Sequence, residues 1–124
     1  MSRMHKSINV FGEKLKSCCD NPKTGFFRDG YCNTYTEDYG MHTVCILITK
    51  DFLRFSKSVG NDLSTPNQMF NFKGLKPGDR WCLCALRWKE ALDNNMAPPV
   101  FLDSTHYNTL KVLDLIDLQK YAFN

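Results

Sequence analysis

The sequence carries little excess charge and no long apolar run, and these two absences exclude several classes of protein. Lys and Arg number 16 and Asp and Glu number 13, which leaves a formal net charge of +3. That excess is too small to indicate a nucleic-acid-binding protein. The longest purely apolar run is Val44–Ile48, far shorter than the roughly 20 residues of a membrane-spanning helix. We therefore expect neither nucleic acid nor a membrane as a partner.

Export and catalytic motifs are missing as well. The first ten residues hold no apolar stretch of the signal-peptide kind, so we expect a cytoplasmic protein whose six cysteines stay reduced. The adjacency of Cys18 and Cys19 also argues against a disulfide framework, and we expect no disulfide. The common hydrolase, metalloprotease, phosphate-loop and dinucleotide motifs do not occur. Whether the protein is an enzyme is left open.

Length and composition predict one globular domain. The chain has 124 residues, of which 43% are hydrophobic and 23% charged, enough to build a single core without metal or disulfides. We expect residues 1–124 to form this domain, with residues 1–7 as a mobile terminus.

Two segments, 42–49 and 80–85, alternate in the manner of strands. Each has one strongly apolar face and one face that carries cysteine. The apolar faces consist of Val44, Ile46, Ile48, Trp81 and Leu83. The other faces carry Cys45, Cys82 and Cys84, next to Arg80. We expect the two strands to be neighbours in one sheet, so that the cysteines share a face.

Helical patterns follow both strands. Residues 50–59 predict a helix capped by Thr49 that buries Phe52 and Phe55, and Gly60 suits the position after its end. Residues 86–94 predict a helix that buries Trp88 and Leu92. Further along, we expect a third strand at 100–102, a helical turn capped by Ser104 or Thr105, and a terminal helix at 115–122.

These elements favour an α+β fold. We expect a two-layer sandwich, with a small mixed or antiparallel sheet, helices mainly on one face and long structured loops. The segment 11–41 is irregular but aromatic, and we expect it to cover the cysteine face as a second small core or a pocket. It would bring Phe26, Phe27, Tyr31 and Cys32 to that face, with Arg28 and Asp29 at the rim.

Several phrases occur together in a fixed order. They are TGFFRDG at 24–30, HTVC at 42–45, GNDLSTP at 60–66, GLKPGDRWCLCA at 74–85, and APPV at 97–100 followed by Thr105–His106. In these phrases the chain resembles a mainly bacterial family known as domain of unknown function 2237, over about residues 9–122. The resemblance implies a compact α+β fold and supplies no catalytic residues. The chain departs from the family where Asn94–Met96 replaces a glycine-containing turn.

The cysteines allow three interpretations. Cys32, Cys45, Cys82 and Cys84 could be plain core residues, since cysteine packs like a small hydrophobe. They could instead bind zinc, although no CxxC pair occurs. A redox-active or nucleophilic thiol is the third interpretation, because the Arg80 guanidinium favours a thiolate. No cofactor is assigned, although these residues suit zinc or another soft metal.

Polar residues on the loops are the candidates for ligand binding. They are Arg28, Asp29, Asn61, Asp62, Arg80 and His106. The alternative is that the Asp and Asn side chains only close turns and that the histidine only caps a helix. Two functions follow: a small cytoplasmic binding domain that holds a small ligand or a partner protein, or a thiol- or metal-dependent protein built on Cys45, Cys82 and Cys84.

Overall fold

The computed structural model describes residues 4–123. Its strands and α-helices are, in chain order, β1 (His42–Leu47), α1 (Lys50–Ser58), β2 (Arg80–Cys84), α2 (Ala85–Asp93) and α3 (Leu115–Lys120). Short 3₁₀ helices lie at Gln68–Phe70, Leu102–Ser104 and Tyr107–Lys111. The predicted α+β class is confirmed, and the strands predicted at 42–49 and 80–85 and all three predicted α-helices are present.

Strands β1 and β2 are neighbours, as predicted, and they pair in the antiparallel direction. Cys45 lies opposite Cys82 in their register, and an irregularity interrupts β1 between His42 and Val44. The expected third strand at 100–102 is reduced to single bridges of Val100 with Ile46 and Ala122. The pairing stops there because the chain enters a 3₁₀ helix at Leu102.

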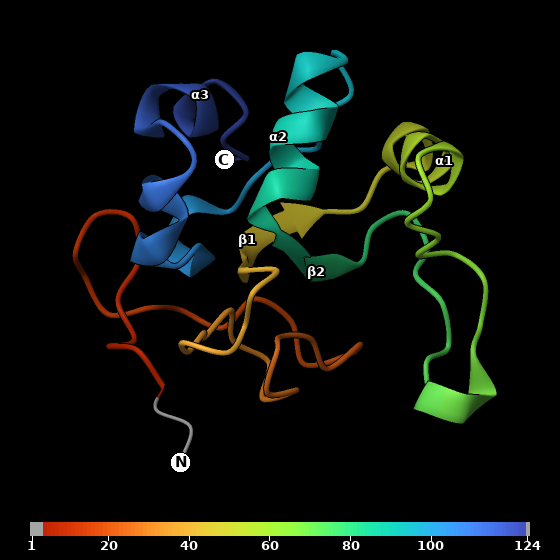
Figure 1. Cartoon of the computed structure of the whole chain (residues 1–124), viewed down its shortest axis with the longest axis horizontal. Helices are drawn as coiled ribbons and strands as arrows, with labels where there is room; N and C mark the ends of the chain where they lie inside the picture. The colour runs from red at the N-terminus through yellow and green to blue at the C-terminus, as the bar shows by residue number, and fades with distance from the viewer. Residues whose placement is uncertain (1–3, 124) are drawn as a thin grey trace.

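The apolar faces of both strands form the main core with the helices, and Figure 1 shows α2 standing on one side of the sheet. Trp88 of α2 is fully buried, and its indole Nε1 donates to Pro98 O at 3.2 Å. Helix α1 begins where Thr49 Oγ1 accepts from Phe52 N at 3.1 Å. Phe52 is buried, whereas Phe55 is partly buried against the core. Helix α2 therefore covers one face of the sheet, and α1 packs against α2 in the same core.

The N-terminal segment covers the opposite face, as the red to orange trace in Figure 1 shows. The backbone N–H of Cys82 donates to Thr24 Oγ1 of this segment at 2.8 Å. A second small core lies beneath it, formed by Cys18, Cys32, Cys45 and Cys82, with Phe101 packed against them. The prediction that segment 11–41 covers the cysteine face is confirmed.

The aromatic residues of this segment differ from the expectation. Phe26, Phe27 and Tyr31 keep 37–38% of their surface exposed and lie outside the second core. Phe26 and Phe27 instead pack on Tyr35, with ring centroids 4.9 and 5.2 Å away. The cysteine side chains already fill the space over the sheet, so the larger rings are left at its edge.

The first residues that the structure describes are hydrogen-bonded to the body of the domain. His5 N donates to Thr34 O at 2.7 Å, and Lys6 O accepts from His106 Nε2 at 2.8 Å. Of the expected mobile terminus 1–7, residues 1–3 lie outside the described residues.

Candidate functional site

A pocket of about 480 Å³ opens where the N-terminal segment meets the end of the sheet and the start of α2. We call it the Arg28–Arg87 pocket. It is lined by Phe26, Arg28, His42, Asn61, Leu63, Trp81, Leu83, Cys84 and Arg87. Three of the predicted candidates, Arg28, Asn61 and Cys84, therefore lie around one cavity, although they come from three distant parts of the chain.

His42 and Asp38 form a close pair at this pocket. The Asp38 side chain is fully buried, and its Oδ1 lies 2.7 Å from His42 Nδ1. The other oxygen, Oδ2, accepts from Thr34 Oγ1 at 2.9 Å and from His42 N at 3.0 Å. These contacts fix the imidazole in one orientation. In the neutral form of the imidazole, Nδ1–H donates to Asp38 and Nε2 is an acceptor.

Cys84 and His42 lie opposite each other at the end of the β1–β2 pairing. The two residues are Cα partners in the β1–β2 register, and directly opposed side chains of antiparallel strands have Cβ atoms about 5 Å apart. Cys84 is a free, half-buried cysteine and is also the N-cap residue of α2. The pocket lining therefore includes a free thiol and a histidine whose Nδ1 atom is held by a buried carboxylate.

Two guanidinium groups give the pocket its charge. Arg28 has left-handed backbone (φ 54°), and its Cζ lies 5.1 Å from the centroid of the Trp81 ring. Its Nη1 donates to Gly25 O at 2.7 Å, which directs the side chain over the tryptophan. Arg87 donates to Val59 O at 3.3 Å and to Glu90 Oε1 at 3.2 Å. Among the lining residues that the structure describes, none is acidic.

Asn61 and Asp62 are neighbours on one loop, but only one of these two candidates lines the pocket. Asn61 lines the pocket. Asp62 is exposed and closes a turn, accepting from Thr65 Oγ1 at 2.6 Å and from Ser64 N at 3.0 Å. The hydrogen bond from the Thr65 hydroxyl, with that from Ser64 N, holds the pKa of the Asp62 carboxyl well below its usual range. The hydrogen bonds of Asp62 therefore hold the conformation of the loop that carries Asn61.

Asp29 and Arg80 lie away from this pocket. Asp29 accepts from Tyr31 N at 3.0 Å and from Asn33 Nδ2 at 3.1 Å, so it closes its own turn. Arg80 stacks on the other side of the sheet, with its Cζ 4.0 Å from the centroid of the Phe101 ring.

His106 is buried and caps a helix. Its Nδ1 accepts from Asn108 N at 3.0 Å, which makes it the N-cap of Tyr107–Lys111 in place of the expected Ser104 or Thr105. Its Nε2 donates to Lys6 O, so both ring nitrogens are occupied. Burial lowers the pKa of the His106 imidazole. One ring nitrogen accepts and the other donates, which is the pattern of the neutral form.

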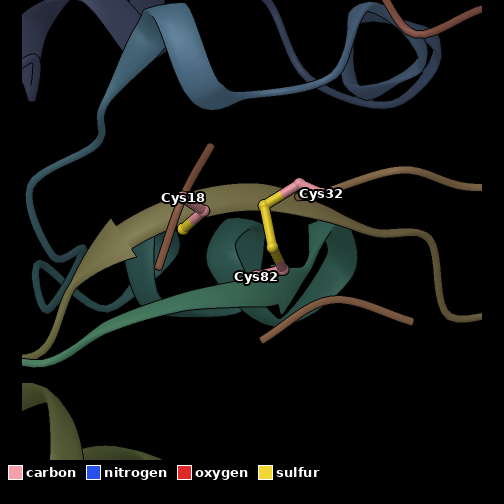
Figure 2. Close-up of side chains that lie close together, drawn as sticks. All are labelled: Cys18, Cys32 and Cys82. Atoms are coloured by element: carbon pink, nitrogen blue, oxygen red, sulfur yellow. A yellow bond between two sulfur atoms is a disulfide. The ribbon is translucent and has the colours of Figure 1, made fainter. Parts of the chain in front are cut away.

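The structure contradicts the expectation of six free thiols. Disulfides join Cys18 to Cys45 and Cys32 to Cys82, while Cys19 and Cys84 are free. Figure 2 shows the Cys32–Cys82 bond with the Cys18 sulfur beside it. The partners are 27 and 50 residues apart in the sequence. Local spacing could not reveal these pairs, because the sheet and the loop that covers it bring them together.

Cys84 does not join the other three cysteines that we expected to cluster. Strand alternation placed it beside Cys82, but the strand ends at Cys84 and the chain turns into α2 (φ −55°, ψ 130°). The thiol lines the pocket that Trp81 and Leu83 also line. Cys18 takes its place in what we call the four-cysteine cluster: Cys18, Cys32, Cys45 and Cys82.

Sequence reasoning missed Asp38 and Arg87. A signal existed for each: Asp38 stands four residues before His42, and Arg87 stands three residues after Cys84, about one helical turn away. Neither spacing is specific enough to select a site without the fold.

The chain was compared with known proteins. None of the helices in residues 4–123 is both long and apolar enough to cross a membrane. The search of curated proteins found no match. A family model described as an uncharacterized protein conserved in bacteria matches residues 8–122. The chain thus belongs to the bacterial family named domain of unknown function 2237, as its sequence phrases predicted.

Proposed function

We propose that this protein binds a small anionic molecule, with an apolar or aromatic part, in the Arg28–Arg87 pocket. The observation that carries this proposal is the charge of the lining: two guanidinium groups and no carboxylate among the described lining residues. Guanidinium groups bind carboxylates and phosphates through paired N–H donors. A carboxylate or phosphate is therefore the ligand group that suits this pocket.

The positions of the two arginines support the same proposal. Arg28 is stacked on Trp81 and uses Nη1 on Gly25 O, which leaves most of its five N–H donors for a ligand. Arg87 shares its charge with Glu90, so the pocket suits one or two negative charges. Asn61 adds a side-chain amide that can donate to the same anion.

The size and walls of the pocket favour a small molecule over a partner protein. Pockets of roughly 300–1,000 Å³ are typical of small-molecule sites, and this one measures about 480 Å³. Phe26, Leu63 and Trp81 supply apolar surface. An aromatic ring of the ligand would pack against these side chains while its anionic group meets the arginines.

A second candidate function is nucleophilic chemistry by Cys84, which the pairing of Cys84 with His42 favours. His42 Nε2 would take the thiol proton while Asp38 holds Nδ1–H. The sulfur would attack the carbonyl carbon of a bound ester or thioester to form a C–S bond. The bond to the leaving group would break, and that group would receive the proton from His42. Water would then hydrolyse the Cys84 thioester, releasing a carboxylic acid and the free thiol.

The binding experiment is a calorimetric screen of aromatic carboxylates and aryl monophosphates against the wild-type protein and three variants. We expect Arg28→Gln and Arg87→Gln each to weaken binding by roughly 10- to 100-fold, since a hydrogen bond to a charged group contributes about 1.5–3 kcal/mol. Arg54 is exposed on α1 and lines none of the described pockets. The Arg54→Gln variant should bind like wild type, and an equal loss in all three variants would refute the proposal.

A further inference from the structure

We propose that the four-cysteine cluster is a zinc site in the reduced protein, where Cys18, Cys32, Cys45 and Cys82 bind one Zn²⁺ in place of the two disulfides. The site lies on the face of the sheet that Cys45 and Cys82 share, beneath the N-terminal segment. The site shares no residue with the Arg28–Arg87 pocket. The zinc proposal is therefore independent of the proposal that the pocket binds an anion.

Four separate pieces of chain bring their sulfur atoms to this place. Cys45 on β1 and Cys82 on β2 are direct Cα partners. Cys18 and Cys32 come from the covering segment, where Cys18 N donates to Gly30 O at 2.8 Å. All four residues are at most 3% exposed. Water is therefore excluded from the sulfurs, as in closed structural zinc sites with four protein ligands.

Three of the four sulfur atoms already lie near the spacing that zinc requires. The Sγ atoms of Cys18, Cys32 and Cys82 lie within 4.8 Å of one another, and Cys45 is bonded to Cys18. Zn–S bonds of about 2.3 Å in a tetrahedron put the sulfurs about 3.8 Å apart. The Cα atoms of the bonded pairs are 5.7 and 5.3 Å apart. Rotation of the four side chains can therefore supply most of the change.

The environment also suits the charge of such a site. Four thiolates around Zn²⁺ carry a formal charge of −2, and a buried charge needs a partner nearby. Phe101 packs against the cluster, and the Arg80 guanidinium is stacked 4.0 Å from the centroid of that ring. Arg80, which we considered as a ligand-binding residue, thus places a cation on the ring that packs against the proposed metal site.

In the reduced protein, a bound metal would link the covering segment to the sheet, as the disulfides do in the oxidised protein. Residues 4–41 contain no helix or paired strand, only isolated bridges, so cross-links to β1 and β2 hold this covering segment in place. A cytoplasmic location, which stays a prediction, would keep the cysteines reduced. A zinc ion bound by two cysteines from the segment and two from the sheet restores the same connection.

Each of the two disulfides receives two electrons and two protons from one molecule of a dithiol reductant. The products are four cysteine thiols and two oxidised dithiols. Binding of Zn²⁺ then releases four protons to solvent as four Zn–S bonds form. No oxidant or further cofactor takes part.

The test begins with the wild-type protein, reduced without oxygen and given one equivalent of ZnCl₂. We expect one zinc per chain by native mass spectrometry. After brief alkylation and peptide mapping, Cys18, Cys32, Cys45 and Cys82 should be protected, while Cys19 and Cys84 are modified. CoCl₂ in place of zinc should give the absorption bands of a tetrahedral cobalt thiolate. The disulfide-bonded protein should bind neither metal.

Matched variants complete the test. Cys19→Ser removes the free thiol next to Cys18 and should still bind one zinc, whereas Cys82→Ser should lose at least tenfold in affinity. If Cys82→Ser does not fold, the protection pattern of the wild-type chain decides. Absence of bound metal in the reduced protein, or alkylation of the four cysteines at the rate of Cys19, would overturn the site.

Discussion

His42 and Cys84 are directly opposed residues at the end of the β1–β2 pairing, and both line the Arg28–Arg87 pocket. The sequence places them 42 positions apart, and only the antiparallel register joins them. Asp38 Oδ1 lies 2.7 Å from His42 Nδ1, so the cross-strand partner of the free cysteine is a histidine of fixed orientation. The first prediction therefore concerns the reactivity of the Cys84 thiol.

Cys84 should react faster with iodoacetamide than Cys19 in the native disulfide-bonded protein. Both are free and half-buried, but only Cys84 has a histidine opposite it that can accept its proton. An ordinary thiol is a few per cent thiolate at pH 7, so assisted deprotonation can raise the rate by about tenfold. Peptide mapping after timed alkylation measures both rates in one sample.

The matched variant for this prediction is His42→Gln. It should slow alkylation of Cys84 toward the rate of Cys19 and leave the rate of Cys19 unchanged. Equal rates at the two cysteines in the wild-type protein would remove the support for nucleophilic chemistry at Cys84. Ligand binding at the arginines would not be affected by that result.

Gly25 should be indispensable for the turn that carries Arg28. Gly25 has φ +103°, and a Cβ atom added there would collide with the backbone carbonyl oxygen of Tyr31. Gly25→Ala therefore strains the backbone and pushes the turn away. We expect a lower midpoint of urea unfolding and weaker anion binding, because Gly25 O positions the Arg28 guanidinium.

Gly60→Ala is the control for this change. Gly60 also has a positive φ, +92°, but open space surrounds the position of its missing Cβ. It should lose only about 1 kcal/mol of stability. If both variants lose the same stability, the close approach of Gly25 to the Tyr31 carbonyl does not account for the effect of Gly25→Ala.

Removing the Phe52 side chain should destabilise the domain more than removing that of Phe55. Phe52 is 1% exposed, whereas Phe55 is only partly buried. Phe52→Ala should cost about 3–5 kcal/mol, from lost burial and the cavity that remains. Urea denaturation of both variants measures the difference, and a larger loss for Phe55→Ala would contradict the packing of α1.

Acidification should destabilise the fold through His106. Burial lowers its pKa in the folded state from the ordinary value of 6.5. Between these two pKa values the unfolded chain binds more protons, so the contribution of His106 is complete above the unfolded pKa and is lost as the pH falls toward the folded pKa. NMR titration of the imidazole C–H signals should give His106 a midpoint below 6.5.

His106→Gln should reduce the loss of stability between about pH 7.5 and pH 5.5, because the glutamine does not titrate. An unchanged loss in this variant, or a normal midpoint for His106, would show that the imidazole titrates freely in the folded protein.

Much of the fold could be predicted because it depends on local patterns. The alternation in β1 and β2 determined which residues face the helices, and Thr49 and Gly60 marked both ends of α1. The cysteine face followed from the same alternation. Cys84 was the exception, because strand periodicity no longer holds once the chain turns into α2.

The site could be predicted only in part. Arg28 and Asn61 were named as candidates because of residue type and loop position, and Cys84 because strand alternation placed it with the other cysteines. Nothing in the sequence joins the three around one cavity. The partners of Cys18 and Cys32 depend on how the covering segment folds over the sheet. Such contacts between distant residues are decided by tertiary packing, which spacing along the chain does not report.

The most direct test of anion binding in the Arg28–Arg87 pocket is an NMR titration of ¹⁵N-labelled wild-type protein with the tightest aryl carboxylate or phosphate from the calorimetric screen. We expect the largest shift changes at the side-chain N–H signals of Arg28, Arg87 and Trp81. The Trp88 indole, which is buried against Pro98, should change little and serves as the internal control. Shift changes centred elsewhere, or none with any aryl carboxylate or phosphate, would contradict the proposed function.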